Sequence, residues 1–347
     1  MATYKEAGVD IEMGDECSRI AYEAAKATFP VREGMIGAPV IMEGGFSGAM
    51  DFGDFYLVQN DDGIGTKMVI AQQIGKFDTM GYDLLGTVAD DAICVGAEVV
   101  SMSNTMDVEK VDKETIGELM EGLKNACIEQ KIVIPGGEIA ELGTMVKGNV
   151  WNSTAIGIVE KEKFITGNDV QAGDELIGLG SNVFRSNGFT LVRHILHEKF
   201  GDNWFNEPFG DGQSWGEVVL APTKIYHNCV LDMVGRYKQP RAVDIKAIAH
   251  ITGGGLPGNV VRILKGKNLG ARMENLPEPH EAVLKVKEFG NVSDEEAYKT
   301  WNMGIGMVIV SNEFGKIKEI ADKHGVEAYK IGNITDEPGI SVEGLRF

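Results

Sequence analysis

The stretch Leu57-Val58-Gln59-Asn60-Asp61-Asp62-Gly63-Ile64-Gly65-Thr66-Lys67 joins two different sequence patterns. Before it, the apolar and partly β-branched run from Phe55 to Val58 predicts a buried strand. After it, apolar residues from Val69 to Ile74 have helical spacing. Amide N–H groups at a helix start, a lysine and a strand-end carboxylate can together hold a metal-bound polyphosphate. The same residues also suit a plain acidic turn with a surface lysine, so this stretch alone leaves both interpretations open.

The composition is that of a globular protein with room for two domains. The chain has 347 residues, of which 43% are hydrophobic and 24% are charged. Its formal net charge of −19 argues against nucleic acid or an anionic membrane as a partner, because both require basic surface. An anionic substrate must therefore be held locally by metal ions, helix N-termini and a few basic side chains.

Sequence features that would direct the chain to a membrane or to secretion are not evident. The polar N-terminus leads into no apolar run of signal-peptide length, and no apolar segment approaches the ~20 residues that span a bilayer. The four cysteines are far apart, and Cys94 and Cys127 fall in helical apolar patterns. We therefore expect buried thiols in a reducing compartment, and a cytoplasmic protein.

Two acidic residues stand next to each other in a predicted helix over residues 80–95. Its apolar residues share one face, with Asp91 at the edge of that face and Asp90 on the opposite side. We expect Asp90 to be solvated and Asp91 to be a metal ligand or a buried cap, because a carboxylate beside a core requires a partner. A second helix is predicted over 112–130 with Asp112 as its N-cap, followed by a strand over 132–134 and one over 154–159.

A polar stretch at 166–174 marks the predicted boundary between domains 1–170 and 171–347. Beyond it, a strand over 175–179 precedes a glycine-containing turn and a helix over 189–200. That turn is either a plain cap formed by Ser186 and Asn187 or an anion site closed by Arg185. His194 and His197 on the helix are interpreted as a surface pair. A further helix is predicted within residues 220–234, after Pro222.

Three glycines at 253–255 precede a helix that has Pro257 in its first turn, which makes a second candidate anion cradle. Residues 253–258 also fit G-x-G-x-x-G, but no convincing βαβ unit follows them, so we reject a nicotinamide-binding site. The remaining C-terminal sequence predicts a buried strand over 304–310, a charged helix through His324 and a terminal strand.

Taken in order, these segments resemble the aminoimidazole ribonucleotide synthetase (phosphoribosylformylglycinamidine cyclo-ligase) family of purine biosynthesis. The resemblance runs nearly end to end, and many separate blocks occur in the right order. The blocks are Tyr4–Ile11, Gly44–Phe46, Asp62–Lys67, Asp91 with Gly96–Glu98, Gly136–Glu138, Ser186–Arg193, Pro222–Tyr226, Ala249–Leu256 and Asn302–Val308.

The resemblance implies an α/β (α+β) fold of two domains and a homodimer. The N-terminal sheets would form a barrel across the dimer, and the C-terminal domain would hold a mixed sheet with flanking helices. The implied enzyme uses ATP and Mg²⁺ to close the ring of formylglycinamidine ribonucleotide by phosphoryl transfer and nitrogen attack.

The resemblance also implies a role for each matching residue. Asp62 and Asp91 would hold Mg²⁺, Lys67, His250 and Arg185 would act near the reacting atoms, and Glu138 would line the nucleotide side. Cofactor contacts would come further from Gly44, Gly45, Gly63, Gly65, Thr66 and Lys67. Substrate phosphate would be bound by Ser186, Asn187, Gly188, Thr252, Gly253, Gly254 and Gly255.

Several positions depart from the family pattern. Arg185 stands where the family usually has His, Asp90 where it has Asn, and Asn104-Thr105 where it has Asp-Tyr. The block after Glu138 also differs, since Ile139-Ala140-Glu141-Leu142-Gly143 replaces Thr-Ala-Glu-Met-Pro. Two alternatives therefore stay open: another phosphoryl-transfer enzyme of the superfamily, of the small-molecule kinase type, and a non-catalytic nucleotide-binding dimer.

Overall fold

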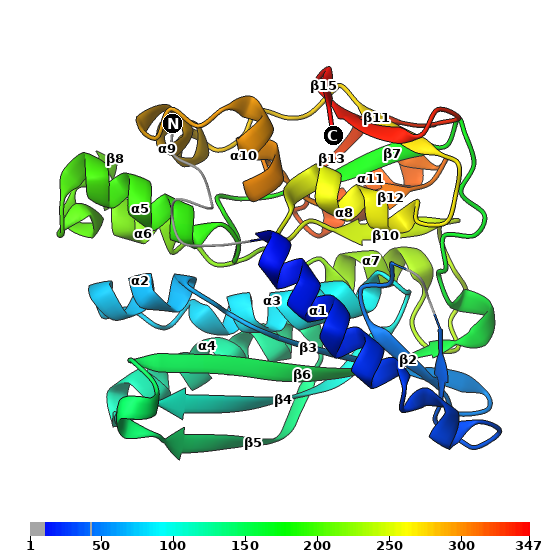
Figure 1. The fold of residues 1–347 in the computed structure, drawn as a ribbon, viewed down its shortest axis with the longest axis horizontal. Helices are drawn as coiled ribbons and strands as arrows, with labels where there is room; N and C mark the ends of the chain where they lie inside the picture. The colour runs from blue at the N-terminus through cyan, green and yellow to red at the C-terminus, as the bar shows by residue number, and fades with distance from the viewer. Residues whose placement is uncertain (1–10, 42–43) are drawn as a thin grey trace.

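The computed structural model describes residues 11–41 and 44–347. The part of the Tyr4–Ile11 block before Ile11 lies outside these residues. Two large sheets, each with helices packed on it, are stacked with further helices between them, which confirms the α/β prediction (Figure 1). No helix in the described residues is long and apolar enough to cross a membrane.

The first sheet lies in the N-terminal half and has six strands in the order β1-β2-β3-β6-β4-β5. Only the β4–β5 pair is parallel, and helix α4 supplies the crossover that such a pair needs. Asp112 accepts a hydrogen bond from Thr115 N at 2.7 Å, so the predicted N-cap of α4 is confirmed. The elements are α1 (Ile11–Lys26), β1 (Ala38–Val40), β2 (Gly48–Asp51), β3 (Phe55–Gly63), α2 (Lys67–Ile74), α3 (Met80–Ile93), β4 (Glu98–Val108), α4 (Lys113–Gln130), β5 (Val133–Glu141) and β6 (Asn149–Glu160).

Two strands of this sheet are longer than predicted. Strand β3 continues through Asp61 and Asp62, with Asp62 opposite Ser153 on β6. Strand β5 likewise contains Gly136, Gly137 and Glu138. Glycine and Asp are poor strand formers, but the neighbouring strands β6 and β4 hold them in the ladder. The acidic residues are therefore strand residues and not part of the turns that follow.

Helix α3 is covered on both sides, which the helical pattern did not predict. One face packs on the first sheet, and the opposite face contacts α7 (His227–Val234) of the C-terminal half. Asp90 is consequently fully buried, and the prediction that it is solvated is wrong. Helix α7 itself begins at His227, a few residues later than the start predicted after Pro222, and ends at Val234 as predicted.

The second sheet has seven strands in the order β10-β12-β7-β13-β11-β14-β15, all antiparallel except the β11–β14 pair. Its strand β12, second in this order, is buried at every position, as predicted. The strands are β7 (Glu175–Gly180), β10 (Ala247–His250), β11 (Gly270–Met273), β12 (Ile305–Val310), β13 (Ala328–Thr335), β14 (Gly339–Val342) and β15 (Leu345–Arg346), with β8 (Pro208–Gly210) and β9 (Gln213–Ser214) in a separate hairpin. The helices are α5 (Phe189–Phe200), α6 (Trp215–Val219), α7, α8 (Gly255–Ile263), α9 (Glu281–Phe289), α10 (Asp294–Thr300) and α11 (Phe314–Lys323).

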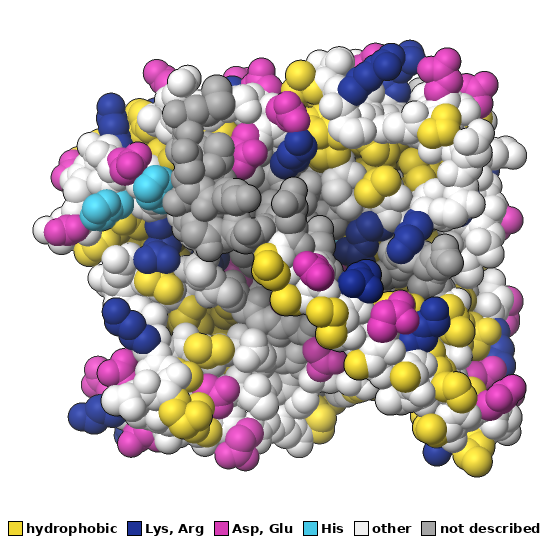
Figure 2. Space-filling model, in the orientation of Figure 1, with side chains coloured by type: hydrophobic (Ala, Val, Ile, Leu, Met, Phe, Trp, Pro, Cys, Tyr) yellow, Lys and Arg dark blue, Asp and Glu magenta, His cyan; other side chains and the backbone are white. Residues whose placement is uncertain are grey.

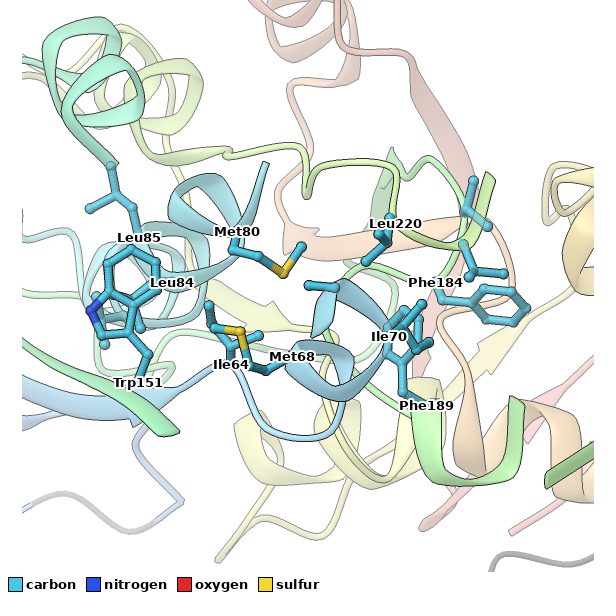
Figure 3. Close-up of a cluster of buried hydrophobic side chains, with 14 of the residues drawn as sticks. Ile64, Met68, Ile70, Met80, Leu84, Leu85, Trp151, Phe184, Phe189 and Leu220 are labelled. Carbon is cyan, nitrogen blue, oxygen red and sulfur yellow. The ribbon is translucent and has the colours of Figure 1, made fainter. Parts of the chain in front are cut away.

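The hydrophobic core joins the two halves of the chain. Phe184, Phe189 and Leu220 of the second half belong to the same buried cluster as Met68 and Trp151 of the first (Figure 3). The division into domains 1–170 and 171–347 stays a prediction. Helix α3 contacts the turn before α5 through Arg185 and Ser186, and the candidate site lies at this closely packed joint.

Candidate active site

Three separate segments meet at Asp91 on α3. His250, the last residue of β10, places Nδ1 at 2.7 Å from Asp91 Oδ1. Asn60 on β3 donates from Nδ2 to Asp91 Oδ2 at 3.1 Å. The Asp91 side chain keeps 17% of its surface exposed, whereas His250 is 1% exposed. Asp91 is thus fixed from both sides while its carboxylate still faces solvent.

Asp62 lies close enough to Asp91 for their charges to interact. Surrounding protein atoms partly desolvate the Asp62 carboxyl and raise its pKa, although the residue keeps exposed surface. The negative charge of Asp91 raises this pKa further, and the hydrogen bond from Gly63 N–H at 2.7 Å opposes both effects. In residues 11–41 and 44–347, no group of three or more His, Cys, Asp or Glu side chains is arranged to hold a metal ion. A two-carboxylate site nevertheless suits Mg²⁺, which usually keeps waters and takes substrate phosphates as further ligands.

A buried chain of hydrogen bonds continues from His250 to Arg185 and Asp90. Arg185 Nη2 lies 2.9 Å from His250 Nε2 and 2.9 Å from Asp90 Oδ2. Because a guanidinium only donates, His250 Nε2 must accept, and this network assigns the ring proton to Nδ1, facing Asp91. Both nitrogens of His250 are therefore engaged within the protein.

Arg185 is held in an unusual backbone conformation. Its φ of 57° lies in the left-handed region, which non-glycine residues seldom occupy. Its guanidinium carbon lies 4.7 Å from the centre of the Tyr226 ring. Asp90, its ion-pair partner, also accepts the N–H groups of Tyr226 and His227 at 2.8 and 3.0 Å, which caps the start of α7. Arg185 and Asp90 thus lock α3 to the C-terminal half.

A second buried network contains Lys67. Its ammonium donates to both oxygens of Asp83 at 2.7 and 2.8 Å and to Ala221 O at 2.8 Å. All three donors are used, and the side chain has no exposed surface. This geometry differs from the expectation that Lys67 contacts phosphates, because tertiary packing gives it a buried acid as its partner.

Asp83 connects Lys67 to the predicted phosphate turn. Ser186 Oγ donates to Asp83 Oδ1 at 2.9 Å, and Thr223 Oγ1 donates to the same oxygen. Ser186 therefore does not cap α5, which begins instead after Gly188 in a left-handed conformation with φ of 77°. Sequence analysis missed Asp83 and Thr223. The one available signal was the seven-residue spacing of Asp83 and Asp90, which places both on the same face of α3.

The two glycine-containing turns lie side by side. A Cβ on Gly253 would be 3.9 Å from Asn187 Oδ1, so the turn before α8 approaches the turn before α5. Gly254, with φ of 91°, precedes α8, and buried Asn259 donates to the carbonyls of Thr252, Gly253 and Gly255 at 2.8–3.3 Å. Two helix N-termini thus open toward one region, an arrangement that favours anions. Asn259, which shapes the turn, was also missed.

The remaining predicted residues lie at varying distances from this centre. Thr66 is exposed, with Oγ1 3.3 Å from Thr190 Oγ1 on α5, and Gly65 beside it is also exposed. Asp62 and Gly63 line a hollow of about 380 Å³ that also contains Asn104 and Thr105, the pair that departs from the family pattern. Glu138 on the edge strand is three strands from Asp62, or about 14 Å at ordinary strand spacing, so one protomer does not bring them together. Gly44 and Gly45 line a different pocket.

Comparison with known proteins gives the family of the chain. Family models described as AIR synthase related protein match residues 45–159 (N-terminal domain) and 171–344 (C-terminal domain). The phosphoribosylformylglycinamidine cyclo-ligase of Pyrococcus furiosus is 37% identical over 351 residues, with 100% of both chains covered. The chain belongs to the AIR synthase family.

A second relative agrees with this membership, and solved structures share the fold. The cyclo-ligase of Methanocaldococcus jannaschii is 36% identical over 340 residues, covering 97% of this chain and 93% of that one. A thiamine-monophosphate kinase from Stenotrophomonas maltophilia shares the fold at a TM-score of 0.62, with 15% identity over 88% of this chain and 91% of that one. A HypE–HypF complex gives a TM-score of 0.63 at 16% identity over 87% and 92% of the two chains. These two likenesses show that the fold is shared with proteins of other names.

Proposed function

We propose that this chain catalyses the ATP-dependent ring closure of formylglycinamidine ribonucleotide to 5-aminoimidazole ribonucleotide, with release of ADP and phosphate, in purine biosynthesis. The observation that carries the proposal is the end-to-end similarity to curated cyclo-ligases, at 37% identity for the Pyrococcus furiosus protein. The buried joint around Asp91 supports the assignment of residue roles.

The proposed reaction has two steps. The formyl oxygen attacks the γ-phosphorus of ATP and ADP leaves; the ribose-bearing amidine nitrogen then attacks the activated carbon, and the formyl oxygen departs with phosphate. Bound Mg²⁺ would neutralise charge on the transferring phosphoryl group. Asp62 and Asp91 would hold that ion; in support, the charge of Asp91 acts on the Asp62 carboxyl, and Asp91 remains partly exposed.

The three residues expected to be catalytic are assigned positioning roles in this proposal. Lys67, Arg185 and His250 are each at most 3% exposed. With both ring nitrogens bonded, His250 orients Asp91 and excludes water behind it. Arg185 holds His250 against α3, and Lys67 holds α2 through Asp83. The turns at Ser186–Gly188 and Thr252–Gly255 are proposed to bind phosphate through their exposed backbone N–H groups.

A homodimer and a cytoplasmic location also belong to the proposal. Strand β5 is an unpaired edge of the first sheet in the described residues, and it exposes 62% of Val133 and 45% of Ile139. An exposed apolar edge strand is a ready surface for a second sheet. In such a dimer Glu138, which lies on this edge, would approach the partner and not its own Asp62.

The direct test is to incubate the purified protein with formylglycinamidine ribonucleotide and Mg·ATP. We expect 5-aminoimidazole ribonucleotide and ADP to appear in equal amounts, and neither to form when Mg²⁺ is removed. A non-catalytic nucleotide-binding protein would take up ATP and release no ADP when the ribonucleotide is added. A small-molecule kinase would release ADP without forming the ring.

A further inference from the structure

A second pocket is distinguished by its charge. It encloses about 430 Å³, and its lining includes the basic residues Lys161, Arg262, Lys265 and Lys267. None of its described lining residues is Asp or Glu, although the chain has 52 acidic residues against 33 basic ones. On the face of the molecule that Figure 2 shows, Lys and Arg side chains gather to the right of the centre. Such a concentration of positive charge is unexpected on so acidic a protein.

Two of these bases are fixed and two are available. Arg262 donates to Gly45 O at 2.7 Å, and its guanidinium carbon lies 3.7 Å from the centre of the Phe46 ring. Lys161 pairs with Asp51 at 2.7 Å. Lys265 is exposed and Lys267 half-buried, and neither side chain forms a hydrogen bond or ion pair with the described residues; only their backbone N–H groups are bonded, to Arg262 and Leu264. Asp169 is the acid whose charge acts on Lys267. Within residues 11–41 and 44–347, the pocket thus presents two ammonium groups that have no hydrogen-bond or ion-pair partner.

The pocket adjoins the acidic site without sharing its residues. Ile248 on β10 lines it, and His250 follows two residues later, about 6.6 Å along a strand. Cys94 also lines it, one helical turn after Asp91. A ligand whose anionic group sits beside the lysines can therefore extend toward Asp91. Apolar and aromatic walls from Val40, Tyr56 and Phe164 suit a neutral organic part.

We propose that Lys265 and Lys267 form a phosphate-binding site for an organic phosphate that reaches Asp91. The inference rests on the proposed function, whose two substrates both carry phosphate: the triphosphate of ATP or the 5′-phosphate of the ribonucleotide. Lys67 has no free donor for either group, because its three N–H bonds are already made within the protein. The lysines beside Arg262 supply the missing positive charge.

The test compares two double variants with the same change in charge. Lys265→Ala/Lys267→Ala removes the unpartnered lysines, whereas Lys316→Ala/Lys318→Ala removes two exposed lysines with the same spacing on α11. Calorimetric titration without turnover measures binding of a non-hydrolysable ATP analogue with Mg²⁺, and separately of formylglycinamidine ribonucleotide. We expect at least tenfold weaker binding of one of these compounds to the pocket variant, and less than a twofold change in the control.

The compound that loses affinity identifies the source of the phosphate. For the ribonucleotide, removing its phosphate should weaken binding to the wild-type protein but not to the pocket variant, because both changes delete the same interaction. Unchanged affinity for both compounds in the pocket variant overturns the proposal, as does a wild-type protein that binds neither. Since binding is measured without catalysis, a protein that binds but forms no aminoimidazole product contradicts the proposed function and leaves the phosphate site supported.

Discussion

His250 Nδ1 lies 2.7 Å from Asp91 Oδ1, and this contact joins the last residue of β10 to the end of α3. It brings together residues that are 159 positions apart in the chain. Because Arg185 donates to the other ring nitrogen, Nδ1 is the nitrogen that donates to Asp91. The orientation of the Asp91 carboxylate is thereby fixed.

Asp91→Asn should keep the hydrogen bond to His250 but remove the charge. We expect the Mg²⁺ concentration for half-maximal product formation to rise at least tenfold, with a smaller change in the KM for the ribonucleotide. Asp202→Asn is the control, because the Asp202 side chain is 94% exposed beyond the end of α5. An unchanged Mg²⁺ dependence of Asp91→Asn would remove Asp91 from the metal site.

Asp62→Asn should abolish turnover and yet stabilise the metal-free protein. The pKa of Asp62 is raised in the folded state above 3.8, first by burial and then by Asp91. The folded chain therefore binds a proton more readily, so this group's stabilising contribution is full below pH 3.8 and is lost as the pH rises through the folded-state pKa. At pH 7 without Mg²⁺, the variant should unfold at a higher temperature than the wild type, and the difference should vanish below pH 3.8. A lower midpoint at pH 7 would contradict the assignment.

Lys67→Met tests whether Lys67 stabilises the fold or contacts substrate. Removing one member of a buried ion pair leaves a charge without its partner, which costs about 3–5 kcal/mol. We expect urea unfolding to show a loss of this size, and a much smaller further loss when Asp83→Leu is added, because the pair acts as a unit. If Lys67 bound phosphate instead, the KM for ATP would rise while the free energy of unfolding stayed near its wild-type value.

Much of the fold could be predicted because local patterns agreed with tertiary packing. The helix over 189–200 was predicted with the bounds that α5 has, since its apolar spacing and flanking glycines coincide. Strand β12 was recognisable from its continuous apolar run. The pairing of Asp62 with Asp91 came from the family resemblance, and it stays a prediction; in the structure the charge of Asp91 raises the pKa of the Asp62 carboxyl.

The errors arose where a distant segment supplies the partner. Asp90 was expected to be solvated because one helix has one apolar face, but α7 covers the other face and uses Asp90 as its cap. Lys67 lies beside two glycines in the sequence, and its acid partner Asp83 is on another helix. Periodicity describes one element at a time, so it does not reveal which polar residue a second element will bury.

His227 should make the protein sensitive to mild acid. It is fully buried and accepts the Val99 N–H at Nε2, and burial lowers its pKa from 6.5 to about 3. The unfolded chain takes up a proton below pH 6.5 that the folded chain does not, so stability falls as the pH drops through this range. From the pKa difference, we expect a loss of about 2 kcal/mol at pH 5 relative to neutral pH. In urea unfolding, His227→Gln should lose none of this stability between neutral pH and pH 5. The control His194→Gln, on the surface of α5, should show the same loss as the wild type.

Gly306→Ala should disturb the Arg185–His250 contact without touching either residue in the sequence. A Cβ at Gly306 would overlap Tyr226 Oη and lie 2.6 Å from Arg185 Nη1, and both groups are fully enclosed. Overpacking of this kind costs about 1–3 kcal/mol, and displacement of Arg185 should also reduce the rate of product formation. Gly315→Ala is the matched control, because a Cβ there meets nothing within 4 Å and lies on exposed α11. The control should gain about 0.5–1 kcal/mol from its higher helix propensity. If Gly306→Ala and the wild type had equal stability and activity, the side chains of Arg185 and Tyr226 would be able to accommodate the added methyl group, and this prediction would be wrong.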